Sequence, residues 1–248
     1  MNDSRINTYS YQVMPQDLDG KRHFRAVSLE MMLLNIAGKA AADRNFGAFK
    51  LIDNGGISWV LLKFAVEMSK MPSEDETLSI STWVEKVGSL LTTRNFEIHD
   101  QTGEIIGCAT SEWAIIDLET RRPMNISADS AIADCATGIK VPVALPGRLT
   151  GLVPDGSTLK RTVTVSYSDI DFNGHTNSIQ YLQWLLDAYP IEKVYDSRMA
   201  RLEIIYVHEV LHGETVNVYY MDQDDGSTLF VVKDQEGNDC VRARIVWK

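Results

Sequence analysis

The chain has 248 residues, a length that fits either one large domain or two small ones. Hydrophobic residues make up 44% of the chain and charged residues 23%, as in a folded globular protein, which excludes a disordered chain. The formal net charge of −10 and the pI near 5.0 exclude the basic surface typical of nucleic-acid binders, so we expect no nucleic-acid partner.

The composition also bears on where the protein acts. No run approaches the roughly 18 apolar residues of a membrane span, and the first residues lack the basic and apolar regions of a signal peptide. The cysteines are three, widely separated, and in no metal-like or redox-like spacing. We therefore expect a cytoplasmic protein whose Cys108, Cys135 and Cys240 are free thiols without a catalytic task.

An internal repeat organises the chain. In each half an Asp-x-Asp segment is followed by a histidine at the same spacing, and the two copies are 152 residues apart. The residues are Asp17, Asp19 and His23 in the first copy and Asp169, Asp171 and His175 in the second. A Glu-Thr pair, an Asp-x-x-Gly turn and a tryptophan then recur in the same order. These anchors are Glu76 and Glu214, Gly103 and Gly237, and Trp113 and Trp247.

Both copies predict the same elements in the same order. A short strand precedes the Asp-x-Asp loop, and in the first copy a helix follows from about Ser28 to Arg44. In the second copy, apolar residues at three-to-four spacing from Ile179 to Tyr189 predict a helix. Asn177 or Ser178 can cap its start, and Pro190 ends it. Strands are expected at residues 202–207, 215–220, 229–232 and 240–247.

The two copies are joined by a segment rich in breakers of secondary structure. Residues 138–161 hold three of the seven prolines and several glycines, which predicts a linker. One helix followed by about four strands in each copy indicates an α+β fold in which an antiparallel sheet wraps a helix.

The loop of the second copy concentrates groups that can do chemistry. Asp171, Asn173 and His175 bring together a carboxylate, an amide and an imidazole just before a helix start, where backbone N–H groups favour a developing oxyanion. Gly174 lets the backbone approach a reacting carbonyl closely. The same residue types also serve as helix caps and turn formers, so the pattern alone leaves a purely structural role open. The first copy has Lys21 where the second has Asn173, which predicts a single site per chain.

The pattern Asp-x-Asp-x-Asn-Gly-His-x-Asn, followed by Tyr181, Trp184 and Asp187, resembles the signature of the acyl-acyl carrier protein thioesterases. The resemblance covers the whole chain and implies two tandem hotdog folds, each a long helix wrapped by an antiparallel sheet. On this basis residues 1–137 would form an N-terminal hotdog with a degenerate site, residues 138–161 the linker, and residues 162–248 the catalytic C-terminal hotdog.

The resemblance also implies roles for individual residues. Asp171 would be the catalytic carboxylate, Asn173 and His175 its partners, and Glu209 the second acid. The interval from His175 to Glu209 agrees with the family pattern, and a surface glutamate without a role in the site is the alternative. Plant members often have a cysteine after this glutamate, and here the position is Val210, which favours attack driven by a carboxylate over attack by a cysteine.

The expected reaction is hydrolysis of fatty acyl-[acyl carrier protein] thioesters, the step that ends fatty-acid synthesis. The expected partner is acyl carrier protein, with no metal or organic cofactor, and a homodimer is one possible assembly. By resemblance the fatty chain lies against the first copy, where Met31, Met32 and Leu34 are candidate contacts, with ordinary core packing as the alternative. A non-catalytic acyl-binding or regulatory protein is the alternative function.

A second motif competes with this interpretation. His208, Glu209 and His212 match the H-E-x-x-H pattern of zinc metallopeptidases. That pattern needs a helix to place both histidines on one face, whereas residues 202–207 predict a strand and Gly213 follows directly. In an extended strand His208 and Glu209 point to opposite faces, so the zinc site is disfavoured and Glu209 remains available to the loop.

Overall fold

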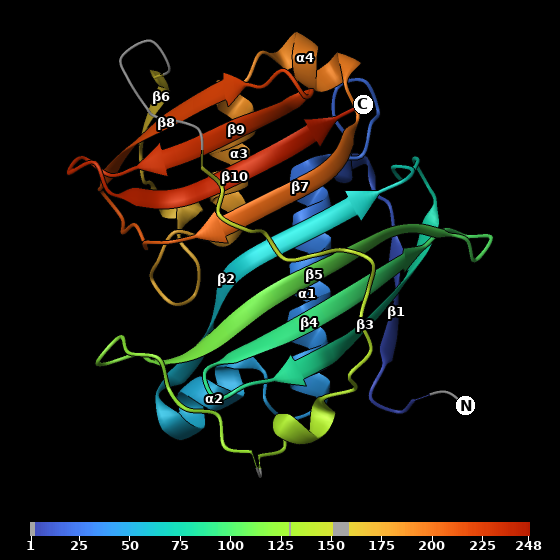
Figure 1. Cartoon of the computed structure of the whole chain (residues 1–248), viewed down its shortest axis with the longest axis vertical. Helices are drawn as coiled ribbons and strands as arrows, with labels where there is room; N and C mark the ends of the chain where they lie inside the picture. The colour runs from blue at the N-terminus through green and yellow to red at the C-terminus, as the bar shows by residue number, and fades with distance from the viewer. Residues whose placement is uncertain (1–2, 129, 151–158) are drawn as a thin grey trace. The chain divides into compact units, whose positions relative to one another are not determined.

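A computed structural model gives the structure of the chain and describes residues 3–128, 130–150 and 159–248. The chain divides into two compact units, Met1–Leu145 (unit 1) and Pro146–Lys248 (unit 2), and each is described here by itself. Each unit combines a long helix with an antiparallel sheet of five strands, which confirms the α+β class (Figure 1). Within the described ranges, none of the helices has the length and apolar character needed to cross a membrane.

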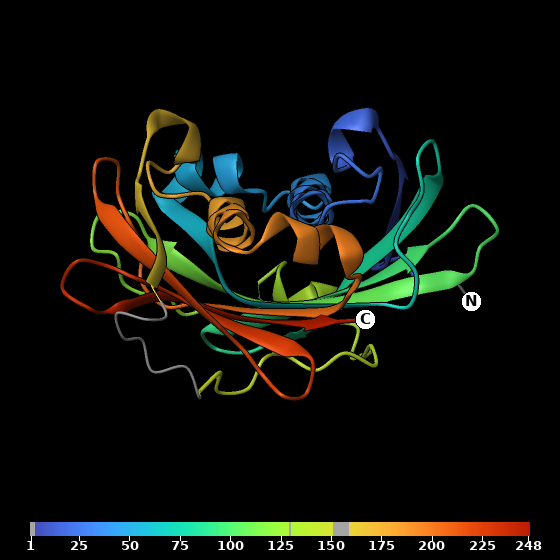
Figure 2. The same ribbon diagram turned by 90° about the horizontal axis from the view of Figure 1, so that it is seen from above.

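Unit 1 is a sheet with its long helix on one face (Figure 2). In sheet order the strands are β1 (Asn7–Gln12), β3 (Thr77–Val87), β4 (Leu91–His99), β5 (Ile105–Asp117) and β2 (Ile57–Met68). Each strand pairs antiparallel with its neighbour. The helices are η1 (Pro15–Asp17), α1 (Ala26–Asp43), α2 (Ala48–Gly55) and η2 (Ala133–Cys135).

The core of unit 1 follows from two periodicities. Leu29 and Leu33, four residues apart on α1, are fully buried on one face of the helix. Phe96 and Ile98, two residues apart on β4, are fully buried on one face of the sheet. Burying side chains of this size stabilises the fold by about 1.5–3 kcal/mol each.

The opposite face of this sheet is covered by the chain that leaves unit 1. The carbonyl of Ile139 accepts hydrogen bonds from the indole of Trp83 (2.8 Å) and the amide of Asn95 (3.1 Å). Val143 is buried against Ala65 and Cys108. Residues 138–145 of the predicted linker are therefore packed into unit 1. Residues 151–158 lie outside the described residues, and residues 159–161 already belong to the first strand of unit 2.

Unit 2 repeats the architecture of unit 1. In sheet order its strands are β6 (Leu159–Thr164), β8 (Thr215–Asp222), β9 (Ser227–Lys233), β10 (Asp239–Trp247) and β7 (Met199–Tyr206). Its helices are η3 (Tyr167–Asp169), α3 (Ser178–Ala188) and α4 (Ile191–Asp196). The helix and the four strands predicted for the second copy are all present, and their ends lie within three residues of the predicted ones.

Equivalent hydrogen bonds confirm the internal repeat. The N–H of Val13 donates to the carbonyl of Glu76 at 2.9 Å, and Val165, 152 residues later, donates to Glu214 at 2.9 Å. Both Asp-x-x-Gly turns have their glycine, Gly103 or Gly237, at a φ of 86°, a conformation that favours glycine. The repeated sequence anchors therefore mark repeated structure.

Two short helices differ from the predicted elements. Helix α2 has eight residues and α4 has six, so neither is long enough for apolar residues to establish a helical period. Pro190, predicted only to end a helix, also stands at the N-cap of α4, where its fixed φ suits a helix start. The local sequence therefore predicts the break between α3 and α4 but not the second helix.

The cap of α3 offers a test of local stability. The side chain of Asn177 accepts a hydrogen bond from the N–H of Ile179 at 3.2 Å. We expect Asn177→Ala to lower the free energy of unfolding by about 1 kcal/mol, because one N–H at the helix start loses its acceptor. Urea unfolding followed by circular dichroism measures this change, and Asn177→Asp, which keeps an acceptor, is the control. An alanine variant as stable as the parent would show that the cap contributes nothing.

Candidate active site

The loop between η3 and α3 is closed by the carboxylate of Asp171. Its Oδ1 accepts hydrogen bonds from the N–H groups of Asn173 (2.8 Å) and His175 (3.2 Å). The N–H of Asp171 donates to the carbonyl of His175 at 2.8 Å, and the N–H of Gly174 donates to the carbonyl of Asp171 at 3.1 Å. Gly174 has a φ of 82°, a conformation that favours glycine. This loop fixes Asp171, Asn173 and His175 within five residues.

A strand end brings the fourth predicted residue to this loop. Nδ1 of His175 lies 3.4 Å from Oε2 of Glu209. Nδ1 is buried, and it meets no acceptor or donor in hydrogen-bonding geometry within the described ranges, so the nearby carboxylate is its polar neighbour. A carboxylate therefore faces the Nδ1 edge of the imidazole. The four predicted site residues thus lie near one another in unit 2: Asp171, Asn173, His175 and Glu209.

Thr176 holds the two segments together. Its N–H and its hydroxyl both donate to the carbonyl of Val210, at 3.0 and 2.8 Å. His175 and Leu211 on either side form an antiparallel bridge. Because Thr176 follows His175 and Val210 follows Glu209, these bonds set the distance between imidazole and carboxylate. Sequence reasoning missed Thr176, whose only signal was its place between the histidine and the helix cap.

Aromatic side chains pack beneath this junction. Tyr181 is buried, with its ring 5.2 Å from that of Trp184 and 6.2 Å from that of Tyr206, both edge to face. Burial is the main reason why the pKa of Tyr181 is raised, and contacts with Thr176 and the backbone of Val210 act in the opposite direction. Tyr181 therefore stays protonated and supports the loop from the core side.

The backbone donors of the loop are used by the loop itself. The N–H of Gly174 is bonded to Asp171, that of Thr176 to Val210, and that of Asn177 to Asp169 at 2.8 Å. The N–H of Gly174 thus serves the turn, and the oxyanion role of this residue stays a prediction. Donors for a developing negative charge would then be side chains, for which the amide of Asn173 and the imidazole of His175 are suited.

The cysteines do not supply a nucleophile. Burial raises the pKa of the Cys240 thiol to about 12 and that of the Cys108 thiol to about 11, so both are protonated near neutral pH. Residue 210, after the candidate acid, is a valine that is 1% exposed. Cys240, the cysteine of unit 2, is therefore poorly suited to act as a nucleophile.

The first copy of the loop has the same backbone with different side chains. Oδ1 of Asp19 accepts from the N–H groups of Lys21 (2.8 Å) and His23 (2.9 Å), and the N–H of Arg22 donates to the carbonyl of Asp19 at 3.0 Å. Nδ1 of His23 lies 3.5 Å from Asp19 itself. At the offset of 138 residues, the counterpart of Glu209 is Met71. Unit 1 therefore has neither the amide nor the second acid.

The competing zinc motif lies outside any helix. Residues 207–212 follow the end of β7, the N–H of His208 donates to the carbonyl of Cys240 at 3.1 Å, and Leu211 bridges to His175. Among the described residues, no group of three or more His, Cys, Asp or Glu side chains is placed to hold a metal ion. The two histidines therefore do not share the helix face that the peptidase pattern requires.

A separate groove in unit 2 does not contain these residues. It has a volume of about 400 Å³ and runs between β6 and α3, lined by Arg161 and Asp187, whose side chains are 3.2 Å apart. Polar side chains form most of its walls. The groove is not lined by the candidate site residues, and its hydrophilic lining does not suit a fatty chain.

The comparisons with known proteins agree with this architecture. Two hotdog units in one chain, one of them with the complete loop, define a double-hotdog protein. The chain matches the acyl-ACP thioesterase N-terminal domain over residues 5–133 and the acyl-ACP thioesterase C-terminal domain over residues 154–248. It belongs to the acyl-ACP thioesterase family.

Individual relatives give the extent of the similarity. An acyl-ACP thioesterase from Bacteroides thetaiotaomicron has a TM-score of 0.89 and 34% identity, covering 98% of each chain. The 12:0-ACP thioesterase from Umbellularia californica has a TM-score of 0.87 at 19% identity, covering 100% of this chain and 99% of the other, and supports the fold alone. The chloroplastic acyl-[acyl-carrier-protein] hydrolase FATB1 of Cuphea viscosissima is 25% identical over 82% of this chain. The chain spans about half the length of such curated plant relatives (51% for FATB1).

Exchange of Glu209 tests the contact between the carboxylate and the imidazole. Glu209→Gln keeps the size of the side chain but removes the charge that faces Nδ1 of His175 at 3.4 Å. We expect kcat for acyl-thioester hydrolysis to fall about 10- to 100-fold with little change in KM, because the imidazole loses the group that orients it. Glu236→Gln, the same change on an exposed turn, is the matched control. Equal kcat values for the two variants would remove Glu209 from the site.

Exchange of Thr176 tests the hydrogen bonds that join the loop to the segment after β7. Thr176→Val removes the hydroxyl that donates to Val210 and keeps the branched shape and the backbone bond. We expect the free energy of unfolding to fall by about 1 kcal/mol, and kcat to fall more than KM changes, because the distance between His175 and Glu209 is no longer fixed. Thr176→Ser should restore both quantities. A valine variant with normal kcat would show that the backbone bond suffices.

Proposed function

We propose that this protein hydrolyses fatty acyl-[acyl carrier protein] thioesters to the free fatty acid and the carrier protein, the step that ends fatty-acid synthesis. The observation that carries the proposal is the complete loop of unit 2, with His175 held 3.4 Å from Glu209 in a chain of this family. The relatives support the substrate class, since their names specify acyl carrier protein.

We assign the chemistry to the carboxylate, amide and imidazole. Attack at the thioester carbonyl is driven by the carboxylate of Asp171, and Asn173 stabilises the carbonyl oxygen. His175 accepts a proton from the water that is consumed and passes it to the departing sulfur. The C–S bond breaks, the thiol leaves with its proton, and oxygen from water ends in the fatty acid. Glu209 keeps the imidazole oriented. A thiol leaves readily, so no metal or organic cofactor is required by this scheme.

We propose that unit 1, residues 1–137, binds the acyl chain, while residues 162–248 perform the reaction. The support is the contrast between the loops, since unit 1 lacks the amide and the second acid. Met31 and Leu34 on α1 are half-buried and Met32 is buried, so the first two are the better placed of the candidate contacts. The unbranched side chain of methionine adapts to a flexible chain.

We also propose the cytoplasm as the site of action and a homodimer as the assembly. All three cysteines are free and buried, as in proteins of a reducing compartment. The plant relatives are named chloroplastic, which applies to those proteins. Light scattering of the purified chain measures the oligomeric state directly.

The reaction is tested by removing the central carboxylate. We expect Asp171→Ala to reduce thiol release from acyl carrier protein thioesters at least about 1,000-fold, because no other group in the loop can drive the attack. The assay covers a ladder of acyl chain lengths, and circular dichroism checks that the variant is folded. Retained hydrolysis would exclude Asp171. A parent protein that captures one acyl ligand per chain without releasing thiol would be an acyl-binding protein instead.

A further inference from the structure

The loop of unit 1 that corresponds to the catalytic loop carries a cluster of exposed cations. Lys21, Arg22 and Arg25 stand within five residues, and no other window of this length in the chain holds three lysines or arginines. All three side chains are exposed, and the neighbouring His23 is 47% exposed. In a chain with a formal net charge of −10, this segment stands out as a local positive surface.

These cations stand where unit 2 has residues that suit the backbone better. Arg22 has a φ of 63° at the position of Gly174, although side chains disfavour this conformation. Arg25 is the N-cap of α1 and makes no side-chain cap bond, whereas its counterpart Asn177 caps α3. A cation at this end of a helix also opposes the helix dipole. The loop therefore keeps its positive charges at a cost to local stability.

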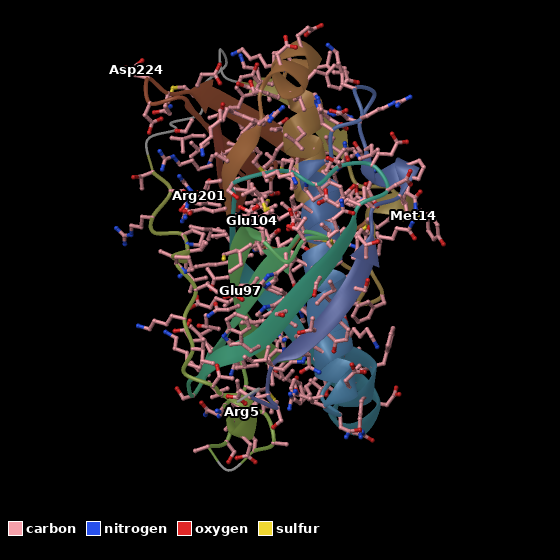
Figure 3. All side chains as sticks on the ribbon, turned by 90° about the vertical axis from the view of Figure 1, so that its right-hand side faces the viewer. Arg5, Met14, Glu97, Glu104, Arg201 and Asp224 are labelled. Carbon is pink, nitrogen blue, oxygen red and sulfur yellow. The ribbon has the colours of Figure 1, made fainter. Side chains whose placement is uncertain are left out.

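Charged side chains at positions where they lower local stability indicate a function other than stabilising the fold. Arg22 lies 3.5 Å from Glu74, but both side chains are exposed, and such pairs exchange readily for other partners. Arg25 donates to the carbonyl of Gln16, which holds its guanidinium beside η1. Met14, which precedes η1, is 42% exposed, and its counterpart in unit 2 is the polar Ser166. In Figure 3 Met14 lies at one end of β1 and Arg5 at the other.

We propose that this surface, formed by Met14, Lys21, Arg22, His23 and Arg25, is the docking site for an acidic face of the carrier protein that delivers the acyl group. The assignment rests on the proposed function. Exposed cations and an exposed apolar side chain in one segment fit an acidic protein surface better than an isolated small anion, because the methionine adds contact area that a small anion does not use. In this arrangement one copy of the loop performs the chemistry and the other binds the partner.

The test transplants the residues of the catalytic loop into the basic one. The variant Lys21→Asn/Arg22→Gly/Arg25→Asn removes three charges and restores the favoured backbone residues. Its midpoint of thermal unfolding should be no lower than that of the parent. For an acyl carrier protein thioester at low salt, we expect KM to rise about five- to tenfold with kcat unchanged. For the same acyl group on N-acetylcysteamine, which carries no protein, we expect KM and kcat to stay the same.

Salt and a matched variant complete the test. Raising the salt concentration should raise KM of the parent for the carrier-bound substrate and change KM of the loop variant little. The control Lys50→Asn/Lys86→Asn/Arg122→Asn removes the same charge at exposed positions on α2, β3 and the segment after β5. A control that raises KM equally, or a loop variant with unchanged KM, would overturn the proposal.

A binding measurement separates docking from catalysis. Fluorescence anisotropy with labelled carrier protein that bears no acyl group reports docking even in a protein that hydrolyses nothing. Weaker binding by the loop variant than by the parent and the control supports the surface. Equal binding by all three proteins refutes it, whatever the outcome of the hydrolysis assays.

Discussion

In each half of this protein, the carboxylate of one aspartate closes the loop in which that aspartate lies. In each copy an aspartate, Asp19 or Asp171, accepts two N–H groups of the residues that follow it and donates its own N–H to the carbonyl of the histidine. The backbone of the loop is therefore fixed by bonds that do not involve the side chains between the aspartate and the histidine. Those side chains are free to differ, and the two copies differ there.

The site also includes a contact between His175 and Glu209, which are 34 residues apart in the sequence. The loop alone positions the carboxylate, amide and imidazole, but the second acid arrives from the end of β7. The bonds from Thr176 to Val210 join the two segments next to the reacting groups. Unit 1 keeps the loop but has Met71 at the position of Glu209, so it lacks this contact.

Much of the fold could be predicted because its helices and strands follow from the regular spacing of apolar residues. The α3 helix, the strands of unit 2 and the repeat itself are visible in apolar spacing and in turn residues such as Gly103 and Gly237. Helices α2 and α4 are too short to show such a period. Residues 138–145 pack on the sheet of unit 1 through the backbone carbonyl of Ile139, and a backbone contact of this kind leaves no signal in the sequence. The grouping of Glu209 with the loop came from family resemblance, and Thr176 could be identified only from its bonds.

The doubled loop has an evolutionary consequence. In a symmetric dimer of single hotdog chains, every substitution in the gene enters both loops at once, so a change that harms the reaction harms it twice. A chain that carries both copies can alter one loop and leave the other intact. Because the aspartate keeps the backbone closed whatever side chains follow, the duplicated segment could drift in charge without losing its shape, and selection could then act on each half separately.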